Sequence, residues 1–95
     1  MLTIYKYHIN EGIIEQNIKM PETAKILKVG LDPKGVPSIW AVVDTDTPPK
    51  ERTLYVVPTG DNLKYYFAPE ENVIYLDTIQ IDKFIWHIFI KREEE

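Results

Sequence analysis

The sequence contains no cysteine, and this absence removes several classes of function at once. Without cysteine the chain forms no disulfide and no thiolate metal site. Only two histidines are present, His8 and His87, and neither has another histidine at helical spacing. Ser38 is the only serine, and no Gly-x-Ser-x-Gly motif surrounds it. We therefore expect no metal, no cofactor and no enzymatic activity.

Long hydrophobic runs and an excess of basic residues are also missing. No apolar stretch approaches the roughly 18 residues that a membrane helix needs, and residues 1–6 lack the apolar stretch of a signal peptide. The formal charge of -4 argues against a duplex-DNA partner, which requires clustered Lys and Arg. The sequence therefore predicts a cytoplasmic protein with neither a membrane nor duplex nucleic acid among its partners.

The pattern of the 95 residues favours one small all-β domain. Runs rich in β-branched and aromatic residues predict strands over 3–9, 13–20, 24–31, 38–43, 52–57, 73–81 and 84–91. The spacing in 13–20 also permits a helical turn, and 69–72 could form another. Leu27, Val29 and Leu31 are expected on one face of their strand. Six or seven short strands without an amphipathic helix predict an antiparallel sandwich or a partly open barrel over 1–92, followed by an acidic tail, 93–95.

Two turn signals predict hairpins. Asp32-Pro33-Lys34-Gly35 combines a proline that presets φ with a glycine that accepts a positive φ, so it should join 24–31 to 38–43. Asp82-Lys83 should join the last two strands. Asp44-x-Asp46 resembles part of a calcium loop but lacks its glycine and closing glutamate, so a local turn around Asp44 is the simpler interpretation.

The most promising binding motif is Pro58-Thr59-Gly60-Asp61, directly after the strand 52–57. A threonine and a glycine at a strand end can present backbone N–H groups to an anion, and Arg52 on the preceding strand could hold a phosphate. The same residues also make an ordinary turn. An aromatic ring could stack on a base, although packing explains the aromatic residues equally well. His87 is either a packed histidine or a lone general base. The candidate ligand-binding residues are Arg52, Thr59, Gly60, Trp40, Trp86 and His87.

Several blocks of the sequence resemble one family of short uncharacterised proteins from tailed phages and prophages. The blocks occur in the same order as the motifs of the family. These motifs are Lys-Tyr, Met-Pro-x-Gly-Ala, Leu-Trp-Ala-x-Val-Asp, a strand that contains arginine, Thr-Gly, Tyr-Ile-Gly-Thr and Trp-His-x-Phe. The matching residues are Tyr5-Lys6-Tyr7, Met20–Val29, Ile39–Asp44, Glu51–Leu54, Thr59-Gly60, Tyr75–Ile79 and Trp86–Phe89. Two residues depart from the pattern: Thr23 stands where the family usually has glycine, and Asp61 stands where it often has histidine. The last turn also lacks the glycines that the family usually has there. The resemblance implies a phage or prophage protein that works in a bacterial cytoplasm. It does not assign a binding or catalytic role to any residue.

Together these features predict a non-enzymatic accessory protein that binds and modulates a host protein, for example to counter an antiviral defence. One alternative is an oligomer that sequesters a small phosphorylated, nucleotide-like ligand, and another is a minor virion or assembly component. We also expect a homo-oligomer, because sheet edges must be covered and the strand 84–89 is long and apolar. Lys6, Lys19 and Pro48-Pro49 are expected to protect other edges.

Overall fold

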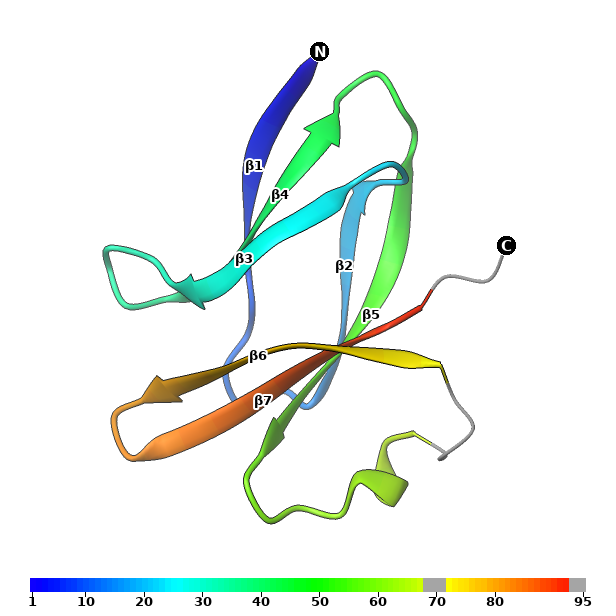
Figure 1. The fold of residues 1–95 in the computed structure, drawn as a ribbon. Helices are drawn as coiled ribbons and strands as arrows, with labels where there is room; N and C mark the ends of the chain where they lie inside the picture. Colours follow the sequence, from blue (N-terminus) through cyan, green and yellow to red (C-terminus); the bar gives the residue numbers. More distant parts are fainter. Residues whose placement is uncertain (68–71, 93–95) are drawn as a thin grey trace.

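A computed structural model describes residues 1–67 and 72–92, and this part of the chain forms seven strands and one short 3₁₀ helix. The elements are β1 (Leu2–His8), β2 (Glu15–Pro21), β3 (Lys25–Leu31), β4 (Pro37–Asp44), β5 (Pro49–Pro58), η1 (Leu63–Tyr65), β6 (Val73–Ile81) and β7 (Phe84–Lys91). Two antiparallel sheets, ordered β1-β4-β3 and β2-β5-β7-β6, pack as a sandwich (Figure 1). The all-β prediction is confirmed, and of the two predicted architectures the structure is the sandwich and not the barrel. The expected acidic tail and most of the expected turn at 69–72 lie outside the described residues.

Both predicted hairpins are confirmed, and side-chain chemistry explains each turn. Between β3 and β4, one carboxylate oxygen of Asp32 accepts the backbone N–H groups of Lys34 and Val36, each at 2.9 Å. Gly35 closes this turn at φ +79°, a conformation that glycine adopts without strain. Between β6 and β7, Asp82 takes a left-handed φ of +54°, which aspartate tolerates better than most residues.

The core lies between the two sheets and follows the two-residue period of the strands. On β4, Ile39, Ala41 and Val43 are fully buried, whereas Trp40 and Val42 between them are only half-buried. The buried residues of the main cluster are Ile9, Ile18, Met20, Val29, Ile39, Leu54, Val56, Ile79, Ile88 and Ile90. All but Met20 are branched aliphatic residues, which suit a pleated, buried surface.

Two β-bulges interrupt the ladders. In β3 the register shifts between Ile26 and Lys28, so Ile26 packs against the core while Leu27 stays 53% exposed. The prediction that Leu27 shares the buried face of Val29 is therefore wrong, because one extra residue turns the preceding side chains over. In β6 a matching shift lies between Tyr75 and Asp77.

The C-terminal strand is an inner strand. β7 pairs with β5 on one side and with β6 on the other, so the edges of the two sheets are β1, β3, β2 and β6. The reason for expecting a homo-oligomer, an exposed edge over 84–89, is therefore removed. Lys6 and Lys19 do lie on edge strands, β1 and β2, as expected.

A second, smaller apolar cluster covers the outer face of the four-stranded sheet. Tyr55 and Val57 alternate with core residues along β5 and are still 2% and 1% exposed. The segment after η1 packs over them, because the Phe67 ring lies 5.0 Å from Tyr55 and 5.6 Å from Phe89, centroid to centroid. Within the segment 65–67, Phe67 packs against this cluster, whereas Tyr65 is 78% exposed.

Candidate functional site

Three of the six candidate ligand-binding residues come together at the end of β5. The hydroxyl of Thr59 lies 2.7 Å from the Nε2 atom of His87, and Gly60 follows directly in the chain. The sheet register explains this meeting, because β7 runs antiparallel to β5 with His87 opposite Val57 and Trp86 opposite Pro58. The backbone N–H of Thr59 donates to the Ile85 carbonyl at 3.2 Å, which extends the ladder by one residue.

His87 is one link in a chain of hydrogen bonds that crosses from β5 to β6. The Nδ1 atom of His87 lies 2.9 Å from the Thr78 hydroxyl, which in turn lies 2.6 Å from the Tyr75 hydroxyl. Tyr75 and Thr78 are three residues apart, so a regular strand would point them to opposite faces. The bulge between Tyr75 and Asp77 places both on the outer face. The local irregularity of β6 thus completes the chain from Tyr75 to Thr59.

A cavity of about 160 Å³ lies beside Thr59 and His87. We call it the Thr59–His87 pocket; its lining residues are Val57, Pro58, Thr59, Gly60, Asp61, Leu63, His87 and Phe89. Most of these side chains are apolar, and Gly60 turns the backbone at φ +90°. Pockets for drug-sized ligands and cofactors measure roughly 300–1,000 Å³, so this one holds a smaller group.

Asp61 places a carboxylate at the pocket, and both of its oxygens are engaged. One accepts the backbone N–H of Asn62 at 3.0 Å and the other accepts the hydroxyl of Tyr66. The hydrogen bond to Asp61, followed by burial, raises the pKa of Tyr66. A negative charge at this position opposes a second negative charge in the pocket, which weakens the phosphate interpretation of the Thr-Gly turn.

The other three candidate residues lie elsewhere. Arg52 is on β5, seven residues before Thr59, which follows the end of that strand; seven extended residues span about 23 Å at ~3.3 Å per residue. Trp40 belongs to the other sheet. Trp86 neighbours His87 but packs against the core, with its ring 6.3 Å from Phe84. The described part of the chain thus forms no single pocket from all six residues.

Sequence reasoning missed an ion pair around the first hairpin. The Asp32 carboxylate accepts a hydrogen bond from the Lys6 ammonium at 3.0 Å, and His8 Nε2 lies 3.8 Å away. The backbone N–H of Val36, followed by Lys6, lowers the pKa of Asp32 to about 2. The turn signal at 32–35 locates Asp32, but Lys6 is 26 residues away and meets it only through the pairing of β1 with β4.

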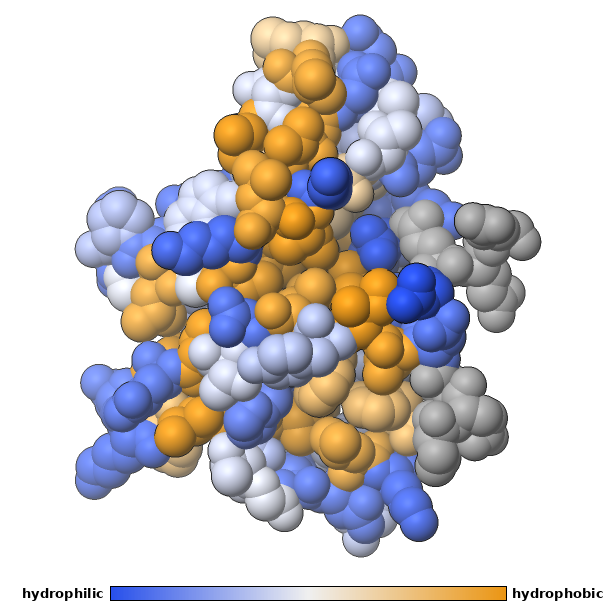
Figure 2. All heavy atoms as spheres, viewed as in Figure 1, coloured by the Kyte–Doolittle hydropathy of each residue, from blue (hydrophilic) through white to orange (hydrophobic). Residues whose placement is uncertain are grey.

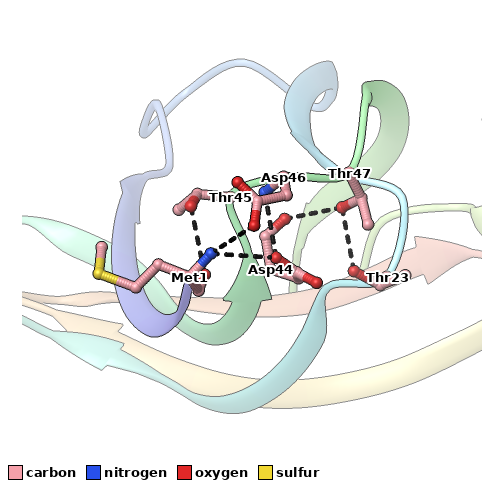
Figure 3. Close-up of polar contacts among 6 residues, drawn as sticks. All are labelled: Met1, Thr23, Asp44, Thr45, Asp46 and Thr47. Carbon is pink, nitrogen blue, oxygen red and sulfur yellow. Dashed lines mark hydrogen bonds and ion pairs between the residues drawn. The ribbon is translucent and has the colours of Figure 1, made fainter.

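The Asp44-x-Asp46 segment holds the N-terminal amine (Figure 3). The Met1 ammonium lies 2.9 Å from Asp46 and 3.4 Å from Asp44, and the hydrogen bond to Asp46 is the main cause of its raised pKa. The backbone N–H of Thr45 donates to the Met1 carbonyl at 2.9 Å. Asp44 also accepts the backbone N–H of Asp46 at 3.1 Å, so the interpretation of this segment as a local turn is confirmed.

One face of the three-stranded sheet carries exposed apolar side chains. We define the β1-β4-β3 outer face by the residues whose side chains point away from the core. They are Leu2, Ile4, Lys6, His8, Lys25, Lys28, Trp40, Val42 and Asp44. Leu2 and Ile4 are 74% and 56% exposed, and with Thr3 and Val42 they line an open groove of about 440 Å³. Figure 2 shows a hydrophobic band through the upper part of the view, where Figure 1 has β1 and β4.

The fold and these surfaces define a small β-sandwich with a pocket of side-chain size beside Thr59 and His87 and an uncovered face on the three-stranded sheet. In the described ranges, no helix has the length and hydrophobicity to cross a membrane. The chain belongs to the family described as a domain of unknown function (DUF7352), which matches residues 1–95. No curated protein and no solved structure matches it.

Proposed function

We propose that this chain is a non-enzymatic phage or prophage accessory protein that binds a protein of its bacterial host in the cytoplasm. The observation that carries the proposal is the β1-β4-β3 outer face, which combines exposed aliphatic residues with lysines. The phage origin rests on the sequence blocks that resemble phage and prophage proteins. Interference with an antiviral defence is one form that such binding takes.

The apolar part of this face is too continuous to be scattered surface residues. Ile4 pairs directly with Val42 across the strands, and Leu2 precedes Ile4 on the same side of β1. Contiguous apolar patches on small soluble proteins mark interaction sites more often than isolated exposed residues do. A partner surface with aliphatic or aromatic residues would remove this area from water.

The charge of the face specifies the partner further. Lys25 lies opposite Val42 and Lys28 lies opposite Trp40, both exposed on the outer side. Of the nearby carboxylates, Asp32 is paired with Lys6, and Asp44 and Asp46 share the Met1 ammonium, so Lys25 and Lys28 outnumber the one carboxylate charge that stays uncompensated. The face is therefore basic although the whole chain carries a net charge of -4. We infer that the partner presents an apolar surface flanked by acidic residues.

The test is a pull-down from bacterial lysate with two charge-reversal variants. Lys25→Glu/Lys28→Glu changes the outer face, and Lys83→Glu/Lys91→Glu makes the same charge change at exposed positions in the β6–β7 turn and at the end of β7. We expect a host protein that the control variant retains and the outer-face variant loses. Carbodiimide cross-linking should join Lys25 or Lys28 to an Asp or Glu of that protein.

Two outcomes would overturn the proposal. Retention of every enriched protein by the outer-face variant would show that this face does not carry the interaction. A dimer in light scattering that Ile4→Ser dissociates would show that a second copy of the chain covers the face instead.

Sequestration of a nucleotide-like ligand is the weaker alternative, because Arg52 and Trp40 are remote from Thr59 in a single copy. A nucleotide panel in a thermal-shift assay tests it, since a ligand at 100 times its Kd stabilises by about 2.7 kcal/mol. Absence of a shift with every nucleotide would exclude it.

A further inference from the structure

We propose that the Thr59–His87 pocket binds a small, uncharged, mainly apolar molecule that carries one hydrogen-bond acceptor, such as an aryl ketone or aryl amide. This site is separate from the β1-β4-β3 outer face, because it lies on the other sheet and on its outer side. The inference is independent of the proposed host-protein binding.

The size and lining of the pocket set the class of ligand. Its volume of about 160 Å³ is close to that of an engineered protein cavity of ~150 Å³ that holds one benzene ring. Val57, Leu63 and Phe89 supply apolar contacts for such a ring. The engaged carboxylate of Asp61 disfavours an anionic ligand.

The hydrogen-bond chain determines which polar group the pocket offers. A neutral imidazole donates from one nitrogen and accepts at the other, so the chain from Tyr75 to Thr59 runs in one of two directions. A phenol is a stronger donor and a weaker acceptor than an aliphatic hydroxyl, so Tyr75 donates to Thr78. Thr78 then donates to Nδ1 of His87.

It follows that Nε2 of His87 carries the proton and donates to the Thr59 oxygen, 2.7 Å away. The Thr59 hydroxyl proton is then not used by His87 and can be donated to a ligand in the pocket. A carbonyl oxygen on a one-ring molecule matches this donor, and the ring matches the apolar walls.

The test compares acetophenone with ethylbenzene, which has nearly the same shape but no acceptor, by amide NMR titration of the whole chain. We expect saturable shifts at Gly60 and Asp61, and acetophenone should bind about 3- to 10-fold more tightly, the usual net effect of one hydrogen bond. Thr59→Val should remove this difference, whereas Thr59→Ser should retain it. Imidazole ¹⁵N shifts should report the Nε2–H tautomer of His87, and Tyr75→Phe should reduce its population.

The outcomes separate the steps of the argument. No saturable shift at Gly60 or Asp61 with either probe would overturn the pocket as a binding site. Equal affinities, or an Nδ1–H tautomer in the unsubstituted protein, would overturn the donor role of Thr59. Spectra of the Thr59 variants that match the parent elsewhere would confirm that the fold is intact.

Discussion

The burial of β4 leads to a quantitative prediction for two isoleucines of the three-stranded sheet. Ile39 on β4 is fully buried between the sheets, whereas Ile4 on β1 is 56% exposed on the outer face. Replacing either by alanine removes the same three carbon atoms. The two substitutions therefore differ in burial and not in chemistry, which makes Ile4→Ala a matched control for Ile39→Ala.

The expected magnitudes follow from that difference. Three buried carbons at ~0.8 kcal/mol each give about 2.4 kcal/mol of lost transfer free energy. The cavity left behind in a packed core raises the total cost of Ile39→Ala to about 3–4 kcal/mol. Less than half of Ile4 is removed from water, so Ile4→Ala should cost about 1 kcal/mol. A domain of 95 residues has a free energy of unfolding of roughly 5–14 kcal/mol, so both variants should fold.

Urea unfolding followed by circular dichroism and tryptophan fluorescence measures both values. The urea midpoint of Ile39→Ala should fall much further than that of Ile4→Ala, and its Tm should drop by roughly 12–25 °C. Equal losses for the two variants would refute the assignment of Ile4 to an uncovered face. A larger loss for Ile4→Ala would refute the register of β1 on β4, because a slip of one residue exchanges the two faces.

Three further predictions concern the hairpin turn and the outer face of the four-stranded sheet. Asp32 has a pKa lowered to about 2 from 3.8, so its contribution to stability is complete above pH 3.8 and is lost as the pH falls towards 2. Asp32→Asn should therefore lower the urea midpoint at pH 7 and flatten its decline between pH 4 and 2; an unchanged decline would contradict this. Tyr66 should ionise at a higher pH than a free tyrosine, because the Asp61 carboxylate accepts a hydrogen bond from the Tyr66 hydroxyl. Asp61→Asn should therefore lower the pKa of Tyr66 in an ultraviolet titration, and an unaltered titration would contradict the hydrogen bond. Phe67→Ala should destabilise by about 2 kcal/mol, since the ring is half-buried between Tyr55 and Phe89, while the exposed Tyr65→Ala should stay within about 0.5 kcal/mol in the same urea assay.

Local signals in the sequence were sufficient for most of the strands and for both hairpins. The turn at 32–35 is predictable because proline, glycine and aspartate each act within a few residues. The bulge at Leu27 was not predictable in this way, since an extra residue in β3 is defined only by its pairing with β4. The Lys6–Asp32 ion pair likewise depends on the registers of three strands.

The candidate site was predicted in part for similar reasons. The Thr59-Gly60 turn and His87 were identified as separate motifs, and the register of β5 on β7 brings them together. The distance of Arg52 from Thr59 follows from the sequence itself, because seven residues of one strand cannot fold back on themselves. The contributions of Tyr75 and Thr78 required the bulge in β6, for which the sequence offers no evident signal.

The two bulges bear on how copies of this chain avoid joining into fibrils. Each sheet has one edge strand that is irregular, β3 or β6, and one that carries a lysine, β1 or β2. An irregular edge cannot offer a neighbouring chain a regular row of backbone donors and acceptors. A lysine on an edge strand would lose its hydration if a strand of another copy paired there. Strand-to-strand polymerisation is thus disfavoured at all four edges. A protein rich in strands can in this way expose an aliphatic sheet face without offering its strand edges to other copies of the chain.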